Sequence, residues 1–180
     1  MSSKWLILAI VVLIYLPVSI DATVLHVATP TLSESLSLSA NELLWIIDIY
    51  SLVMAGLILP MGALGDRIGF KKLMVIGGIL FGLASLAAAF SSTAYALIGS
   101  RALLAVGAAM ILPATLSAVR NTFLDEKQRN FALGIWATVG GGGAAFGPLL
   151  GGFLLEHFHW GSVFLINVPI MLAVIIFTIF

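Results

Sequence analysis

Hydrophobic residues fill this chain in long runs, which short polar stretches interrupt at intervals. Six apolar segments of about 20 residues can be drawn, at residues 5–28, 43–64, 73–90, 95–119, 131–155 and 162–180. A helix of that length crosses the hydrocarbon core of a bilayer and satisfies its own backbone groups there. We therefore predict an all-α membrane protein in which residues 1–180 form one bundle of six transmembrane helices.

The composition excludes several classes of protein. Hydrophobic residues make up 61% of the chain and charged residues 9%, whereas a water-soluble domain carries about 25% charged residues. The net charge is zero, so no nucleic-acid partner is indicated. There is no cysteine, and no nucleophile lies in a pattern with a general base. We therefore expect no enzyme activity, no metal site and no cofactor.

The basic residues outside the apolar segments lie in alternate connections. The stretches at residues 29–42, 91–94 and 156–161 contain no lysine or arginine. By the positive-inside rule, this asymmetry predicts a multi-pass protein of the cytoplasmic (inner) membrane with its N-terminus in the cytoplasm. The seven basic residues of the other connections and the N-terminus are Lys4, Arg67, Lys71, Lys72, Arg120, Lys127 and Arg129.

Three ionisable residues lie within apolar segments, namely Asp21, Asp48 and Arg101. Each costs about 2.5–3.5 kcal/mol near the centre of a membrane helix, which favours a functional or a paired role. All three fall in the outer half of their segments, at depths where they could share one cavity. An Asp–Arg pair that only locks two helices together is the alternative interpretation.

The fifth apolar segment contains an unusual cluster of small residues. Gly143, Gly147 and Gly151 recur every four residues, so they line one face of a helix that Pro148 bends. Small residues allow membrane helices to approach closely, which predicts a tight helix–helix contact. A hinge or seal in a moving bundle is the more specific interpretation.

The amino-acid sequences of two segments resemble motifs of the major facilitator superfamily. Gly143, Gly147, Pro148, Gly151 and Gly152 resemble the antiporter signature of its exporters. The turn at residues 62–73 is similar to the loop between helices 2 and 3 of the family, although Phe70 stands where a basic residue is usual. The resemblance implies a conformational latch at this loop, formed by Gly62, Asp66, Arg67 and Gly69.

Four further segments narrow the resemblance. Residues 98–109 resemble the helix 4 motif whose arginine, here Arg101, is associated with proton coupling, but Leu104 and Ala105 depart from that motif. Segments 21–30 and 160–169 resemble the fourteen-span drug:proton antiporter branch, and residues 45–52 resemble quaternary ammonium and methyl viologen efflux pumps. The likeness covers only the N-terminal six-helix half of such a transporter. Because the chain ends in apolar sequence, we expect it to be truncated there and to lack a C-terminal half as its partner.

The resemblance implies proton-coupled export of lipophilic organic cations, such as quaternary ammonium compounds, dyes and methyl viologen. Asp21 and Arg101 would couple protons to transport, and the substrate would bind at Asp48, Trp45, Tyr50 and Trp136. The fold would be a bundle of two inverted three-helix repeats. Two alternatives remain open: a non-transporting fragment of such a pump, and an exporter of another small molecule with the same fold.

Overall fold

A computed structural model describes residues 3–179 of the chain, which fold into helices and contain no strand in that range. Five of the helices are long and apolar enough to cross a membrane, and the all-α prediction is confirmed. The helices are α1 (Ser3–Leu36), α2 (Ala40–Ile68), α3 (Phe70–Ala89), α4 (Ala94–Thr122), α5 (Glu126–His157), α6 (Ser162–Leu165) and α7 (Asn167–Ile179). The sixth apolar segment is thus divided between two shorter helices, α6 and α7.

Polar side chains between the apolar segments fix where three of the helices begin. Ser39 precedes α2 and forms a capping box with Glu42, in which each side chain accepts from the other residue's backbone N–H. Thr93 accepts from a backbone N–H of α4, and Asp125 accepts from one of α5. These caps satisfy orphan donors of the first helical turn. α2 and α5 therefore begin three and five residues before their apolar runs, and α4 begins one residue before its run.

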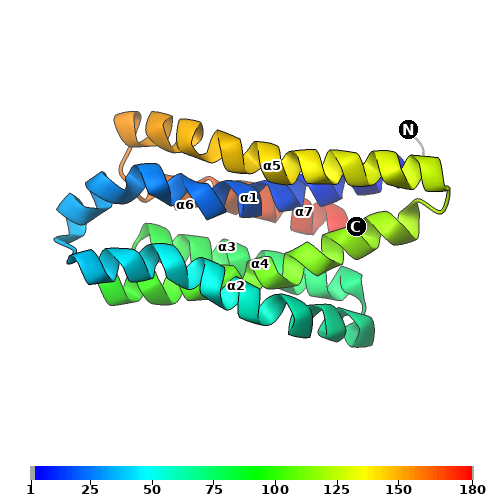
Figure 1. Cartoon of the computed structure of the whole chain (residues 1–180), viewed down its shortest axis with the longest axis horizontal. Helices are drawn as coiled ribbons and strands as arrows, with labels where there is room; N and C mark the ends of the chain where they lie inside the picture. The colour runs from blue at the N-terminus through cyan, green and yellow to red at the C-terminus, as the bar shows by residue number, and fades with distance from the viewer. Residues whose placement is uncertain (1–2, 180) are drawn as a thin grey trace.

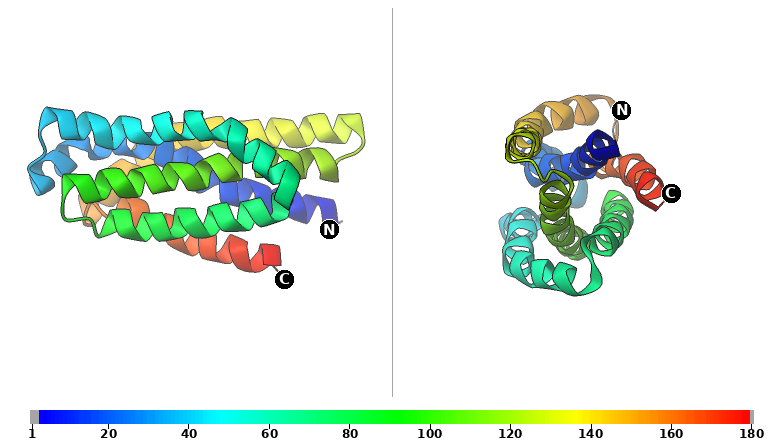
Figure 2. Two further views of the ribbon diagram at one scale, coloured as in Figure 1. Left: turned by 90° about the horizontal axis from the view of Figure 1, so that it is seen from below. Right: turned by 90° about the vertical axis from the view of Figure 1, so that its right-hand side faces the viewer.

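Helices that are distant in sequence lie side by side in the bundle. α1 packs along α5, α4 packs against both α2 and α3, and α7 packs against α3. Figure 1 shows α5, α1, α4 and α2 across the face toward the viewer, with α3, α6 and α7 behind them, and Figure 2 shows the same arrangement from one end of the bundle. The middle of this face is therefore made by α1 and α4, which carry Asp21 and Arg101.

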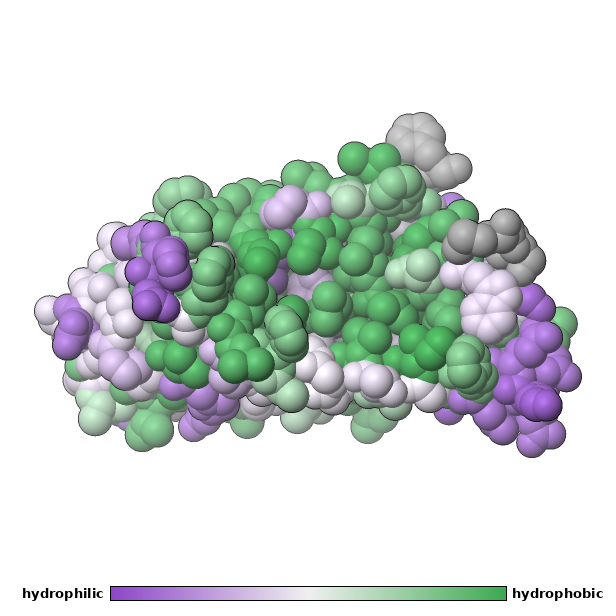
Figure 3. Space-filling model, turned by 90° about the horizontal axis from the view of Figure 1, so that it is seen from above, coloured by the Kyte–Doolittle hydropathy of each residue, from purple (hydrophilic) through white to green (hydrophobic). Residues whose placement is uncertain are grey.

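The two ends of the bundle are polar and its middle is apolar. The N-terminus, the α2–α3 turn and the α4–α5 connection lie at the same end (Figure 1). There Lys4 Nζ donates to Gln128 Oε1 at 2.5 Å, which joins the start of α1 to the start of α5. Figure 3 shows hydrophobic residues over the middle of the surface and hydrophilic residues gathered toward both ends. This distribution is that of a multi-pass membrane protein.

Candidate functional site

A buried ion pair lies at the middle of the bundle. Arg101 Nη1 on α4 donates to Asp21 Oδ2 on α1, and each residue is 1% exposed. Two charges that are buried away from water are tolerated only when they are paired and hydrogen-bonded. The structure therefore joins two of the three ionisable residues that the sequence analysis grouped, whereas the third, Asp48, is exposed. Their role in proton coupling stays a prediction.

The guanidinium of Arg101 is also held by α2. Its Nε donates to the Ile46 carbonyl oxygen at 3.2 Å, and its central carbon lies 4.5 Å from the centroid of the Tyr50 ring. The Tyr50 hydroxyl donates to the Val18 carbonyl oxygen of α1 at 3.3 Å. Tyr50 is 1% exposed, so its ring packs on Arg101 and lines no open wall. Binding of substrate by Tyr50 stays a prediction.

One oxygen of the Asp21 carboxyl group has no partner. Asp21 Oδ1 is buried and forms no hydrogen bond with any residue in the range 3–179. A buried carboxylate oxygen without a donor carries a desolvation cost of about 1–3 kcal/mol or more. The carboxyl group therefore keeps one free acceptor oxygen beside a paired cation.

Asp48 and Trp45 lie apart from this pair. Both side chains are exposed, and Trp45 is 47% exposed. Asp48 forms no ion pair or side-chain hydrogen bond with another residue in the described part of the chain. The two residues are three apart on α2, so they share one side of that helix. They offer a carboxylate and an indole face to whatever contacts α2.

Trp136 connects three helices. Its ring stacks on Tyr15 of α1 with 4.7 Å between the ring centroids and an interplanar angle of 10°. Its Nε1 donates to Thr115 Oγ1 of α4 at 3.2 Å. Sequence reasoning singled out Trp136 but missed Tyr15 and Thr115. The signal was available in part, because an indole N–H within an apolar segment needs an acceptor from a neighbouring helix.

The glycine face of α5 packs closely against α1. A Cβ atom at Gly147 would lie 2.9 Å from the Ile20 carbonyl oxygen, and one at Gly151 would lie 2.9 Å from Val24 Cγ2. Gly143 is buried in the same contact, against Ser19. Gly152 belongs to another side of α5, because a Cβ there would meet nothing within 4 Å. The signature therefore divides between a closely packed face and an open one.

Pro148 leaves a backbone carbonyl of α5 without its usual donor. Proline has no N–H, so the carbonyl oxygen of Ala144, four residues earlier, accepts no intrahelical bond from it. Thr23 Oγ1 of α1 donates to this oxygen at 2.7 Å. The hydroxyl thus replaces the missing donor, and it does so two residues after Asp21. Thr23 is a contact that sequence reasoning missed.

The predicted latch residues lie at the polar end near the N-terminus. Gly69 has φ +92°, a backbone conformation that side chains rarely adopt, and it permits a one-residue turn between α2 and α3. Asp66 and Arg67 are exposed, and no side chain caps the start of α3. Asp66, Gly62 and Arg120 line a cavity of about 290 Å³ between α2 and α4. A latch role for these residues stays a prediction.

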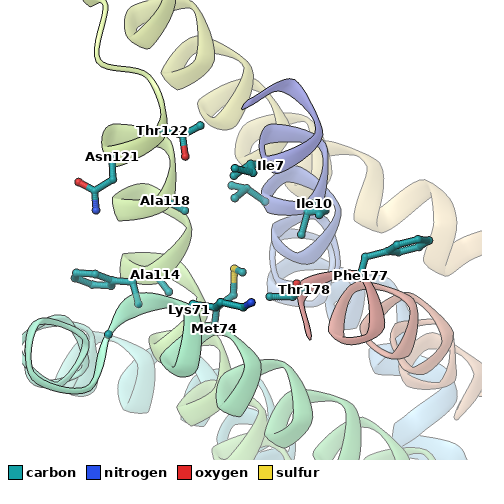
Figure 4. A pocket seen from close by; sticks show the side chains of 13 residues that line it. Ile7, Ile10, Lys71, Met74, Ala114, Ala118, Asn121, Thr122, Phe177 and Thr178 are labelled. Atoms are coloured by element: carbon teal, nitrogen blue, oxygen red, sulfur yellow. The ribbon is translucent and has the colours of Figure 1, made fainter. Parts of the chain in front are cut away.

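A second cavity of about 620 Å³ opens between α1, α3, α4 and α7 (Figure 4). Its walls are mainly apolar, and Lys71 and Asn121 add polar groups to them. Gly69 is the only residue of the predicted sites among its lining residues in the described part of the chain. The ion pair of Asp21 and Arg101 is therefore separate from this cavity. The lining side chains labelled in Figure 4 include Ile7, Ile10, Met74, Ala114, Ala118, Phe177 and Thr178.

Known proteins resemble the chain over nearly its whole length. It is 74% identical over 174 residues to the methyl viologen resistance protein SmvA of Salmonella typhimurium. The matched region covers 97% of this chain and 35% of that protein. It is 49% identical to the multidrug efflux pump LfrA of Mycolicibacterium smegmatis, with 96% of this chain and 34% of the pump covered. It is 38% identical to the methylenomycin A resistance protein of Bacillus subtilis, with 94% and 36% covered.

The chain spans about one third of the length of these curated relatives. Residues 11–180 match the sequence profile of the Major Facilitator Superfamily. That match agrees with a bundle of apolar helices whose ends are polar, and with the resemblance seen in the loop after α2 and in α5. The chain therefore belongs to the Major Facilitator Superfamily of transporters.

Proposed function

We propose that this chain is the N-terminal six-helix bundle of a proton-coupled exporter of lipophilic organic cations. Its substrates would include quaternary ammonium compounds, dyes and methyl viologen. The observation that carries the proposal is the buried pair of Asp21 and Arg101, in which one carboxyl oxygen has no donor. The bundle would lie in the cytoplasmic membrane with its N-terminus in the cytoplasm, as the seven basic residues of alternate connections favour.

The ion pair supplies a place for the coupled proton. Burial favours the neutral form of a carboxylic acid, while the guanidinium of Arg101 favours the charged form. The balance between these two effects changes when the helices that bury the pair move. Asp21 would take up a proton in one arrangement of α1 and α4 and release it in the other.

The exposed side of α2 would contact the cation. Asp48 supplies a carboxylate that is not neutralised by another described residue, and Trp45 supplies an aromatic face three residues away. A cation held over an indole ring is attracted to its negative face, by about 2 kcal/mol when water is excluded. α2 and α5 are also the least buried of the five long spans. In the complete transporter, the C-terminal half would pack opposite these helices and close the site.

The test is a chimera in which this chain replaces the matching segment of the Salmonella relative. Cells that lack their own cation pumps would express the chimera, and their tolerance to methyl viologen would be measured. We expect the chimera to restore tolerance and proton-gradient-dependent efflux. A correctly inserted chimera that gives no tolerance to any organic cation would refute the proposal.

A matched variant separates coupling from folding. Asp21→Asn together with Arg101→Gln removes both charges, so no buried ion is left uncompensated. We expect this double variant to remain in the membrane and to lose efflux driven by a pH gradient. Normal pH-driven efflux would leave the pair with a structural role only.

A second candidate is an exporter of a different small molecule with the same fold. The 38% identity to a methylenomycin A resistance protein favours it. The same chimera distinguishes the two candidates, because tolerance to methylenomycin without tolerance to organic cations would select the second. The chain expressed alone tests the remaining alternative. If the chain is a non-transporting fragment, it should be found in the membrane but should not raise tolerance to quaternary ammonium compounds.

A further inference from the structure

The contacts of Arg101 raise a question about proton uptake by Asp21. In the structure, Asp21 Oδ2 is the only carboxylate oxygen within ion-pair distance of Arg101 among residues 3–179. A proton on Asp21 would therefore leave a guanidinium without a counter-charge in a site where it is 1% exposed. Breaking one side of a buried ion pair is strongly destabilising. Proton uptake is feasible only if something else stabilises the guanidinium.

The ring of Tyr50 is placed to do this. Its centroid lies 4.5 Å from the central guanidinium carbon, within the range of about 6 Å in which a cation is attracted to an aromatic face. The ring is fixed at its far end by the hydrogen bond from its hydroxyl to the Val18 carbonyl oxygen. The Ile46 carbonyl oxygen holds the guanidinium Nε from the same helix. Tyr50 and Ile46 are four residues apart on α2, so they present one face to Arg101.

An aromatic face distinguishes the two protonation states of the pair. The charged pair has no net charge. The attraction of the ring to the guanidinium is therefore offset by its repulsion of the carboxylate. The bare guanidinium beside a protonated carboxyl group feels the attraction alone. The ring therefore stabilises the protonated state more than the charged pair. Removing the negative face of the ring should make proton uptake harder.

We infer that Tyr50 is a positioning residue that holds Arg101 in place when Asp21 accepts a proton. This inference deepens the proposed function, because it concerns the same proton site. Tyr50 acts through Arg101, and it stabilises the guanidinium whether or not a substrate is present. Its contribution is set by the charge on the ring face, and the hydroxyl only fixes the orientation of the ring.

Tyr15 of α1 is the one further ionisable side chain of the described residues that acts electrostatically on Tyr50, and it carries no charge at neutral pH. The membrane parts of α3, α5, α6 and α7 contain no ionisable residue, at positions 73–90, 131–155 and 162–179. Among the described residues, Arg101 of α4 pairs with Asp21, and Tyr50 of α2 packs on that guanidinium. Asp48 of α2 is exposed, on the other side of the helix from buried Tyr50. A change in the pH response of Asp21 can therefore be assigned to this cluster.

The test measures the protonation of Asp21 directly in the full chain, purified and placed in lipid nanodiscs. Infrared spectroscopy detects the carbonyl stretch of a protonated carboxylic acid, and loss of this band in Asp21→Asn assigns it. Three changes are compared at position 50. Tyr50→Phe keeps the ring, Tyr50→Leu removes it, and a ring-fluorinated phenylalanine keeps its shape while removing the negative charge from its face. Tyr95→Leu, at an exposed site on α4, is the matched control.

We expect the pH midpoint of Asp21 protonation to fall by about one unit in Tyr50→Leu and in the fluorinated variant. Tyr50→Phe and Tyr95→Leu should keep the midpoint of the natural chain. A fluorinated variant that titrates like Tyr50→Phe would overturn the inference, because shape and burial alone would then explain the site. The measurement requires no transport, so the inference can stand or fall separately from the proposed function.

Discussion

The close contact between α1 and α5 can be tested by adding a single methyl group. In Gly147→Ala, the new Cβ atom would overlap the Thr23 hydroxyl and would lie 2.9 Å from the Ile20 carbonyl oxygen and 3.3 Å from the Val24 nitrogen. The hydroxyl can rotate away only by giving up its hydrogen bond to the Ala144 carbonyl oxygen. The other two neighbours are backbone atoms of α1, so neither can rotate away. The two helices would have to separate by a few tenths of an ångström along this contact.

The expected cost follows from a comparison on the same helix. Overpacking a close contact costs about 1–3 kcal/mol. In Gly141→Ala, the new Cβ meets nothing within 4 Å, and alanine favours a helix over glycine by up to about 1 kcal/mol. Both variants gain this propensity, so we expect their free energies of unfolding to differ by the overpacking cost of about 1–3 kcal/mol. The difference isolates the contact with α1 from the change in helix propensity.

Unfolding in mixed micelles of a mild and a denaturing detergent would measure this difference through the fluorescence of the four tryptophans. We expect lower stability in Gly147→Ala only. Equal stability of the two alanine variants would refute the close contact described here.

Three further changes test other contacts in the bundle. Thr23→Val leaves the Ala144 carbonyl oxygen without a donor and should lower the free energy of unfolding by about 1–3 kcal/mol, whereas Thr23→Ser keeps the hydroxyl and should restore it. Asp21→Asn leaves Arg101 without a counter-charge and should cost about 3–5 kcal/mol, most of which Arg101→Gln in the same chain should recover. In the chimeric transporter, Asp48→Asn should reduce efflux of dications more than that of monocations. Equal losses would mark Asp48 as a residue that couples protons.

The fold class could be predicted because the length of each apolar run is set by the thickness of the bilayer. The break in the last run was not predicted, since hydrophobicity continues through it. The structure gives a physical reason for this break. α6 ends at Leu165, and Pro169, four residues later, has no N–H to donate to the Leu165 carbonyl oxygen. The buried Asn167 side chain, at the start of α7, donates to Ser85 Oγ of α3 at 3.3 Å.

The candidate site could be predicted only in part, for a similar reason. Depth in the membrane follows from counting residues along a helix, which is how Asp21 and Arg101 came to be grouped. The side of a helix follows from its angular period, about 100° per residue. On this measure Tyr50 lies about 200° from Asp48, so the sequence already separated the two residues that were assigned to one substrate site. Which helices are neighbours cannot be read from either pattern.

The sequence separation between contacting residues also sets the order in which these contacts can form during synthesis. Asp21 is 80 residues ahead of the arginine that neutralises it. At about 5–20 residues per second, a ribosome needs roughly 4–16 s to deliver that arginine. α5, which covers α1, begins later still, at Glu126. Until then the first helix has an unpaired carboxyl group, and its face toward α5 is uncovered. Its assembly depends on this order of synthesis, as well as on the final set of contacts.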